Sequence, residues 1–520
     1  MKKIFKSIIV ALSVILYSSC DALDLSPIDH YGSGNFWNTE AQVHGYMNGI
    51  HSQLRGSYQM FFALGEARGG TLKSGTSTLG TSLDWSDPIK NNQFSKDKTG
   101  VSNWYGMYNK IMQINHFIDQ VENGCSFLND NKRAYYLGQA YGLRALYYSY
   151  LYRTYGGVPL VKEVKVLDGK ISAEKLYTKR SSAEEILTFI KEDISRSEKH
   201  FGDNLSGENK TWTKYATLML KAEMYLWSAK VTTGDHQANK EDAKVAKEAL
   251  KQLEGKFTLL NDFSKVFTDK GNKEIIFALR FKDDEATNWA ANFLYSKEIF
   301  VGQRYSRDGE VYGDVLDLRG NGLLRHEYKS SLWDKYDDND QRRDKTFLDH
   351  YDKDGKNQGL VMLKGLGIIN ANGNRVYESD ILVYRYSDVL LLLAEVENLL
   401  GGDCSKYVNE VRKRAYGEDF NAELSFVKGS FEENELAILA ERDKEFVWEG
   451  KRWFDMVRMQ GADGKALAFK AEANYSDVVG EAPLALLKST ETYKLLWPVD
   501  RGTLNDDPEL TQTPGYDEAN

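Results

Sequence analysis

Seven charged side chains near the carboxyl end have a spacing that could support acid–base chemistry. They are Glu441, Arg442, Glu445, Glu449, Arg452, Asp455 and Arg458. Two carboxylates that flank a glycosidic bond can hydrolyse it. Spacings of three and four residues also place carboxylates and arginines on neighbouring faces of a helix, where they form ion pairs. We interpret the set as structural ion pairs and expect the protein not to be an enzyme.

Other catalytic or metal-binding patterns are missing from the sequence. It contains no GxSxG, HExxH or phosphate-loop motif. Asp352, Asp354 and Asn357 lack the spacing of a calcium-binding EF-hand, and Cys125 and Cys404 form no zinc pattern, so no metal or cofactor is expected. The two cysteines are compatible with one disulfide or with two buried thiols. The 76 acidic residues leave an α-rich glycoside hydrolase or lyase open as an alternative.

Trp85 is the aromatic residue best placed to bind a ligand. It stands in the polar stretch SLDWSDP, residues 82–88, outside any helical period. A flat aromatic ring that buries about 100 Å² of sugar surface gains about 2.5 kcal/mol before ordering costs. We predict Trp85 as a ligand platform, with partial burial in the core as the alternative. Asp84 and Asp87 would accept hydrogen bonds from sugar hydroxyls, and Arg68, before the same stretch, would donate them.

Most of the chain has helical periodicity that would position these side chains. Apolar residues recur at steps of three and four from residue 132 to 155, where Gly156 and Gly157 end the pattern. Ser182 and Glu185 fit a capping box that begins a helix. Further helices are predicted at 213–231, 242–253, 388–400, 405–415 and 433–459, and residues 332–336 also look helical. The paired helices have the length of tetratricopeptide units.

Residues 260–380 differ from the rest of the chain. Helical periodicity fades there, Gly, Asp and Asn accumulate, and residues 274–279 are the clearest predicted strand. Long irregular loops in a compact protein often carry function. The predicted fold class is therefore mainly α, with tetratricopeptide-like helical repeats packed against an irregular, loop-rich ligand-binding part that contains a few short strands.

The first twenty residues have the pattern of a lipoprotein signal peptide. Three lysines within the first six residues precede ten apolar residues, 8–17, and then Ser18, Ser19 and Cys20. Tyr17 departs from the usual lipobox, which has leucine there, so ordinary secretion with nearby cleavage is the alternative. We expect residues 1–19 to be removed and Cys20 to be lipidated, because two or three acyl chains anchor a protein without a membrane helix. The net charge of −9 and the absence of a basic run argue against nucleic-acid partners.

Six segments spread along the chain resemble the SusD/RagB family of Bacteroidetes surface glycan-binding lipoproteins. They are Cys20-Asp21 with Leu23-Asp24-Leu25-Ser26-Pro27; Arg144-Ala145 through Tyr155-Gly156-Gly157-Val158-Pro159-Leu160-Val161; Tyr384-Arg385-Tyr386-Ser387-Asp388-Val389-Leu390-Leu391 through Ala394-Glu395; Val408 through Ala415; Glu441 through Arg458; and Trp497-Pro498-Val499 through Pro514-Gly515-Tyr516. The motifs occur in the family's order and are spread over essentially the whole chain.

The resemblance implies a single SusD-like unit over residues 20–520, with its helical scaffold mainly at 35–255 and 380–460 and a loop-rich insertion at about 260–380. It implies a lipid-anchored protein at the cell surface, on the outer membrane. It also implies binding of an oligosaccharide and a SusC-like TonB-dependent transporter that the protein covers as a hinged lid. Trp289, Asn292 and Tyr305 lie where the family draws ligand contacts.

The binding stretches have no concentrated Lys/Arg cluster, which favours a neutral glycan such as a fructan or glucan. A peptide-binding uptake lipoprotein is a further alternative, since some relatives handle peptides.

Overall fold

The computed structural model describes residues 36–74, 87–99, 104–164, 172–318, 322–476, 478 and 480–516. Helices dominate these residues, as predicted. The longer ones are α2 (Glu40–Glu66), α4 (Tyr105–Asp119), α5 (Asp130–Tyr155), α6 (Ala183–Phe201), α7 (Lys214–Lys230), α8 (Asp242–Lys251), α12 (Tyr386–Leu400), α13 (Ser405–Tyr416) and α14 (Phe431–Glu445). The shorter ones are α3 (Asp87–Lys90), α9 (Lys265–Thr268), α10 (Lys297–Phe300), α11 (Gln341–Thr346), α15 (Arg452–Arg458) and α16 (Arg501–Asp506).

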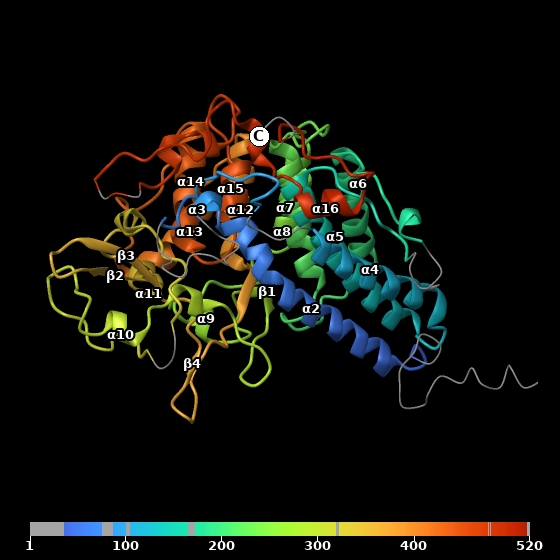
Figure 1. Cartoon of the computed structure of the whole chain (residues 1–520), viewed down its shortest axis with the longest axis horizontal. Helices are drawn as coiled ribbons and strands as arrows, with labels where there is room; N and C mark the ends of the chain where they lie inside the picture. Colours follow the sequence, from blue (N-terminus) through green and yellow to red (C-terminus); the bar gives the residue numbers. More distant parts are fainter. Residues whose placement is uncertain are drawn as a thin grey trace, which may run out of the picture.

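Successive helices pack side by side. α5 lies along α6, α7 along α8, and α12 against both α13 and α14. Figure 1 shows α4 to α8 on one side of the molecule, α12 to α15 on the other, and α2 running from the middle of the molecule to its lower right, beside α4. This is the tetratricopeptide-like scaffold that the sequence predicts.

The strands are few and short. β1 (Ile275–Leu279) pairs with β6 (Ile381–Arg385), β2 (Phe347–Tyr351) with β3 (Asn357–Met362), and β4 (Ile368–Ile369) with β5 (Arg375–Val376), each antiparallel. They lie in or at the borders of the stretch predicted to be rich in loops, whose hairpins protrude from the helical body (Figure 1).

Local sequence signals set most of the helix ends. Ser182 and Glu185 form the predicted capping box of α6, with the Ser182 hydroxyl accepting from the Glu185 N–H. Thr213 caps α7, and Gly156 follows the last residue of α5.

The long helix predicted at 433–459 is wrong. The chain leaves helical geometry after Glu445 and resumes it only at Arg452. Trp448 and Gly450 in between have φ values of +61° and +67°, which no α-helix tolerates. The predicted helix at 332–336 is a 3₁₀ turn, Ser330–Lys335.

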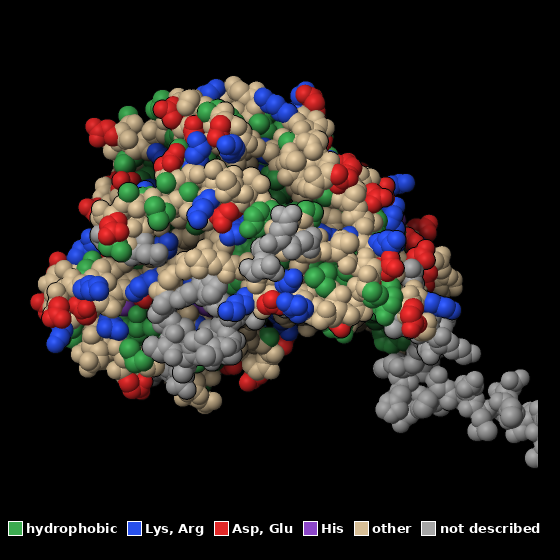
Figure 2. Space-filling view, turned by 45° about the horizontal axis from the view of Figure 1, so that its top comes forward, with side chains coloured by type: hydrophobic (Ala, Val, Ile, Leu, Met, Phe, Trp, Pro, Cys, Tyr) green, Lys and Arg blue, Asp and Glu red, His purple; other side chains and the backbone are tan. Residues whose placement is uncertain are grey.

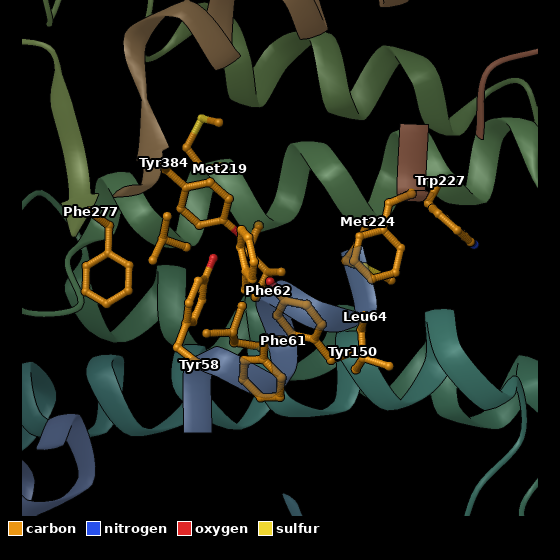
Figure 3. Close-up of a cluster of buried hydrophobic side chains, with 14 of the residues drawn as sticks. Tyr58, Phe61, Phe62, Leu64, Tyr150, Met219, Met224, Trp227, Phe277 and Tyr384 are labelled. Atoms are coloured by element: carbon orange, nitrogen blue, oxygen red, sulfur yellow. The ribbon is translucent and has the colours of Figure 1, made fainter. Parts of the chain in front are cut away.

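A large hydrophobic core joins the elements. It runs from Trp37 to Tyr516 and contains residues of α2, α5, α7, α12, α15, β1 and β6. Figure 3 shows side chains of α2, α5 and α7 meeting in one cluster, where Phe61 stacks on Tyr150 at a ring-centroid distance of 4.0 Å. Stacked aromatic pairs add to the stability given by burial alone. Much of the high aromatic content is thus explained by packing.

Among the described residues, no helix combines the length and the apolar character needed to cross a bilayer.

Candidate functional site

A hollow of about 350 Å³ lies where three distant parts of the chain meet. Its lining comes from Gly70 after α2, from residues 90–93 around the end of α3, from Lys329, and from residues 474–476, 478, 481, 482 and 484–486. Hollows of this volume accommodate small molecules or a few sugar units.

Two buried amides with spare hydrogen-bonding capacity line this hollow. Asn92 and Asn474 line it and are only 2% and 8% exposed. The Asn92 Oδ1 accepts from Arg68 Nε at 2.7 Å, which leaves its Nδ2 without a partner among the described residues. The Asn474 Nδ2 donates to the carbonyl of Leu484 at 2.7 Å, which leaves its Oδ1 without one. Hydroxyl groups can donate to the free acceptor and accept from the free donor.

Gly70 allows the chain to pass close to this site. Its φ is +81°, and a Cβ at this position would collide with the Asn474 Oδ1 and with the Leu486 side chain. Only glycine can adopt this positive φ without strain and also leave space for the two neighbouring side chains.

The rim of the hollow combines apolar and polar groups. Leu484 and Val478 are 81% and 52% exposed, while Asn91 and Gln93 present further amides. Lys329 is buried and its Nζ donates to the Tyr475 carbonyl at 2.9 Å. Apolar surface next to amide groups suits a ligand that has both C–H faces and hydroxyl groups.

Most of the stretch predicted to carry the aromatic platform is not described by the structure. Trp85 and Asp84 lie outside the described residues, as does Cys20. The described residues on either side are tied together, since Ser74 Oγ donates to Asn91 Oδ1 at 3.1 Å and Lys90 Nζ donates to the Lys73 carbonyl at 3.2 Å. Asp87 begins α3.

Arg68 does not fit its predicted role as a direct ligand donor. The side chain is fully buried, and its guanidinium lies 3.8 Å from the ring centroid of Trp453 and 4.3 Å from that of Phe94. Burial lowers the pKa of Arg68 to about 9. Arg68 instead lies behind Asn92 and fixes the orientation of its amide, which makes it a positioning residue.

Trp289 is also misassigned as a ligand platform. It is 8% exposed and belongs to the core, with ring-centroid distances of 5.4 Å to Phe62 and 6.0 Å to Trp448. A ring packed on several sides by other rings offers no face to a sugar.

Asn292 and Tyr305 are partly buried and do not line the hollow. The Asn292 carbonyl accepts from the Arg325 N–H at 2.7 Å, and the Tyr305 backbone bonds to that of Tyr351 in both directions at 2.9 Å. These bonds hold the loops, and the predicted contact of the two side chains with ligand stays a prediction.

The charged set at 441–458 forms buried ion pairs, mostly with partners on other elements. Arg385 is fully buried between Glu445 at 2.5 Å, Glu274 at 2.9 Å and Glu449 at 2.9 Å. Arg458 pairs with Glu395 at 2.8 Å. These pairs are structural, as predicted, but only Arg458 with Asp455 is a pair of the predicted spacing within this set.

These pairs lower the pKa of Glu441, Glu445 and Glu449. Burial opposes the ionisation of Glu445, but Arg414, Arg385 and Arg342 outweigh it and hold its pKa well below the ordinary value. A carboxyl group with such a low pKa is a poor general acid at neutral pH.

The described residues contain no group of three or more side chains suited to hold a metal ion. Asp352 caps the turn between β2 and β3, accepting from the N–H groups of Asp354 and Lys356 at 3.0 Å. Cys125 and Cys404 are both free and buried, so the alternative of two thiols is the correct one.

The sequence reasoning missed Asn92, Gln93 and Asn474. The run Asn91-Asn92-Gln93 directly follows the Trp85 stretch and could have been noticed. Asn474 is almost four hundred residues away in sequence, and no local pattern singles it out.

Known proteins and protein families match this chain in both sequence and structure. Residues 290–516 match the model of the SusD family, and residues 23–226 match a family described as starch-binding and associating with the outer membrane. A solved SusD superfamily protein of Bacteroides fragilis is 40% identical, covers 92% of this chain and 100% of its own, and superposes with a TM-score of 0.84. The chain belongs to the SusD family.

Two further relatives support this assignment. The structure of B. fragilis NanU is 34% identical, covers 95% of this chain and all of its own, and has a TM-score of 0.80. The starch-binding protein SusD of Bacteroides thetaiotaomicron is 22% identical over 99% of both chains. The chain is thus a member of a family of starch- and glycan-binding proteins associated with the outer membrane.

Proposed function

We propose that the protein is a cell-surface lipoprotein that captures an oligosaccharide and delivers it, uncut, to a SusC-like TonB-dependent transporter on which it acts as a hinged lid. In this proposal residues 1–19 are a signal peptide, Cys20 carries the lipid anchor, and residues 20–520 form a single SusD-like unit. Membership of the SusD family supports a glycan as the class of ligand and the outer membrane as the location.

The hollow lined by Asn92 and Asn474 carries the proposal for the binding site. Asn92 Nδ2 and Asn474 Oδ1 have no hydrogen-bond partner among the described residues and are enclosed by protein atoms, so in this proposal the wall of the hollow moves slightly and sugar hydroxyls then bond to them. Trp85, two residues before α3, would stack on the ring face of the same sugar, and Asp84 would accept from a neighbouring hydroxyl. A neutral fructan or glucan fragment is the preferred ligand.

A single hollow of this size binds a sugar weakly. Burial of one sugar face contributes about 2.5 kcal/mol before ordering costs, so useful capture requires several contacts along an oligosaccharide or several copies at one surface. Asn292 and Tyr305 are proposed as contacts for further sugar units.

The test is a titration of the whole chain against neutral glycans, acidic glycans and peptides, followed by calorimetry on the best ligand. We expect an oligosaccharide to bind and Trp85→Ala to weaken binding at least tenfold. Tyr105→Ala is the matched control, because Tyr105 is 70% exposed and lies outside the hollow.

Mass analysis of the glycan after incubation completes the test. Intact oligosaccharide is expected, whereas shortened products would establish a glycoside hydrolase or lyase. Binding of peptides alone would establish a peptide carrier. Full affinity in Trp85→Ala would remove the proposed platform.

A further inference from the structure

A second and larger hollow, of about 540 Å³, lies on different elements. It is formed by the loop at 207–209 before α7, the first turn of α7, the turn at 256–258 after α8, the turn at 270–273, and β1 with Arg280. None of its lining residues is shared with the hollow of Asn92 and Asn474.

Two aromatic rings form part of its wall. Tyr215 and Phe257 are both partly exposed, and their rings meet edge to face with centroids 5.1 Å apart. The pair is packed against the core, so its position is fixed by the scaffold. Rings held in this way bind a flat apolar face at little cost in side-chain entropy.

The polar lining has an excess of positive charge. Lys270 pairs with Glu378 at 3.1 Å, Arg280 with Asp380 at 2.9 Å, and Lys210 with Glu208 at 2.7 Å. Lys256 and Lys273 also line the hollow, are exposed, and form no ion pair with any described residue. Among the residues that line the hollow, four are cations and one is a carboxylate: Lys256, Lys270, Lys273 and Arg280 against Glu208.

This local excess contrasts with the rest of the protein. The chain has a net charge of −9, and Figure 2 shows Lys and Arg mixed with Asp and Glu across the face that it displays. Two unpaired ammonium groups beside a fixed aromatic wall are therefore a local feature, and they suit a ligand that has both a ring face and an anionic group.

We propose that this hollow is a second binding site that takes an acidic saccharide, a sugar unit bearing a carboxylate or sulfate group. The sugar ring packs on Tyr215 and Phe257, and Lys256 and Lys273 donate to the anionic group. The site goes beyond the proposed function, because it is separate from the hollow of Asn92 and Asn474. It requires a negatively charged group on the ligand, whereas the first hollow is proposed to bind a neutral sugar.

The test is calorimetry of the whole chain with three probes. These are a disaccharide that contains glucuronic acid, the disaccharide of the same linkage with glucose in its place, and inorganic sulfate. We expect the acidic disaccharide to bind at least tenfold more tightly than either of the others. The double variant Lys256→Gln, Lys273→Gln should lose at least tenfold of that affinity, and Phe257→Ala should also weaken it.

Lys240→Gln is the matched control, since Lys240 is exposed, forms no ion pair with the described residues, and does not line the hollow. Hydrogen exchange should show that the acidic disaccharide protects residues 256–258 and 270–273. No binding of the acidic disaccharide, full affinity in the double variant, or sulfate binding as tightly as the disaccharide would each overturn the proposal. Asn474→Ala is expected to leave this binding unchanged, so the two sites can fail independently.

Discussion

The buried ion pairs around Arg385 and the hollow around Asn474 use buried polar groups in opposite ways. Arg385 is surrounded by Glu274, Glu445 and Glu449, with at least one charge-assisted bond to each. Asn92 and Asn474 each have one polar atom without a partner among the described residues.

Whether buried polar groups are fully paired distinguishes groups that stabilise the fold from groups that are available to a ligand. Removing one member of a saturated buried set leaves uncompensated charge and costs stability. Unpaired buried amides cost stability in the free protein, and a ligand hydroxyl recovers that cost on binding. Conspicuous clusters of charge in a sequence are therefore poor guides to function when the fold brings opposite charges together.

The largest effect is expected for Arg385→Met. It leaves Glu274, Glu445 and Glu449 buried together with fewer cations, and should lower the free energy of unfolding by about 3–5 kcal/mol or prevent folding. Chemical denaturation followed by tryptophan fluorescence measures this. Arg196→Met is the control. The Arg196 side chain is 46% exposed although it forms ion pairs, so its replacement should lower the free energy of unfolding by about 1 kcal/mol at most. Equal effects of the two variants would break the comparison.

A pH effect of similar size is expected from Glu66. It accepts from the Tyr328 hydroxyl at 2.8 Å and the Gly450 N–H at 3.2 Å, but no ion pair of the described residues includes it. Burial raises its pKa to about 7, whereas the unfolded chain has the ordinary value of about 4.3. The folded state thus holds a proton that the unfolded state has lost, and stability should fall by about 3 kcal/mol as pH rises from 4.5 to 7. Glu66→Gln should remove this part of the slope, and an unchanged slope would show that Glu66 is ionised in the fold.

Asn474→Ala should act on binding. It removes the unpaired acceptor of the hollow and should weaken oligosaccharide binding about tenfold, equivalent to about 1.4 kcal/mol. Gln237→Ala provides the matched amide control, since Gln237 is exposed and outside the hollow. Calorimetry on both variants sharpens the comparison, and equal affinities would remove Asn474 from the site.

The smallest effect is expected at the rim. Leu484→Ser should weaken binding two- to threefold, by loss of apolar contact, while the free energy of unfolding changes by less than about 0.5 kcal/mol. Val427→Ser is the control, because Val427 is 78% exposed and does not line the hollow. A large loss of stability in Leu484→Ser would show that the residue packs in the fold.

Local signals in the sequence predicted α5 to α8, α12 and α13, but α2 and α4 were not among the predicted helices. The capping box at Ser182 and the glycine after Tyr155 specify helix ends through interactions within a few residues. The break between α14 and α15 escaped prediction because it depends on tertiary contacts. A Cβ at Gly365 would meet the Trp448 ring, and a Cβ at Gly65 would meet the Gly450 carbonyl, so the turn is shaped by segments far away in sequence.

The binding site was harder to predict for the same reason. Arg68 and Trp289 have residue types that suit sugar binding, but only the fold shows that rings enclose both of them. Asn474 joins Asn92 through the packing of segments about 380 residues apart. The family motifs at 144–161, 384–395 and 441–458 predicted the scaffold, since they contain helices, helix ends and buried ion pairs that hold it together.

Hydrogen exchange with the oligosaccharide identified by the glycan panel is the most direct test of the account. We predict that the bound glycan protects residues 90–93 and 474–486, that this protection weakens in Asn474→Ala, and that the glycan is recovered intact. Protection that avoids both segments, or recovery of cleaved glycan, would contradict the assignment of this hollow as a binding site without catalysis.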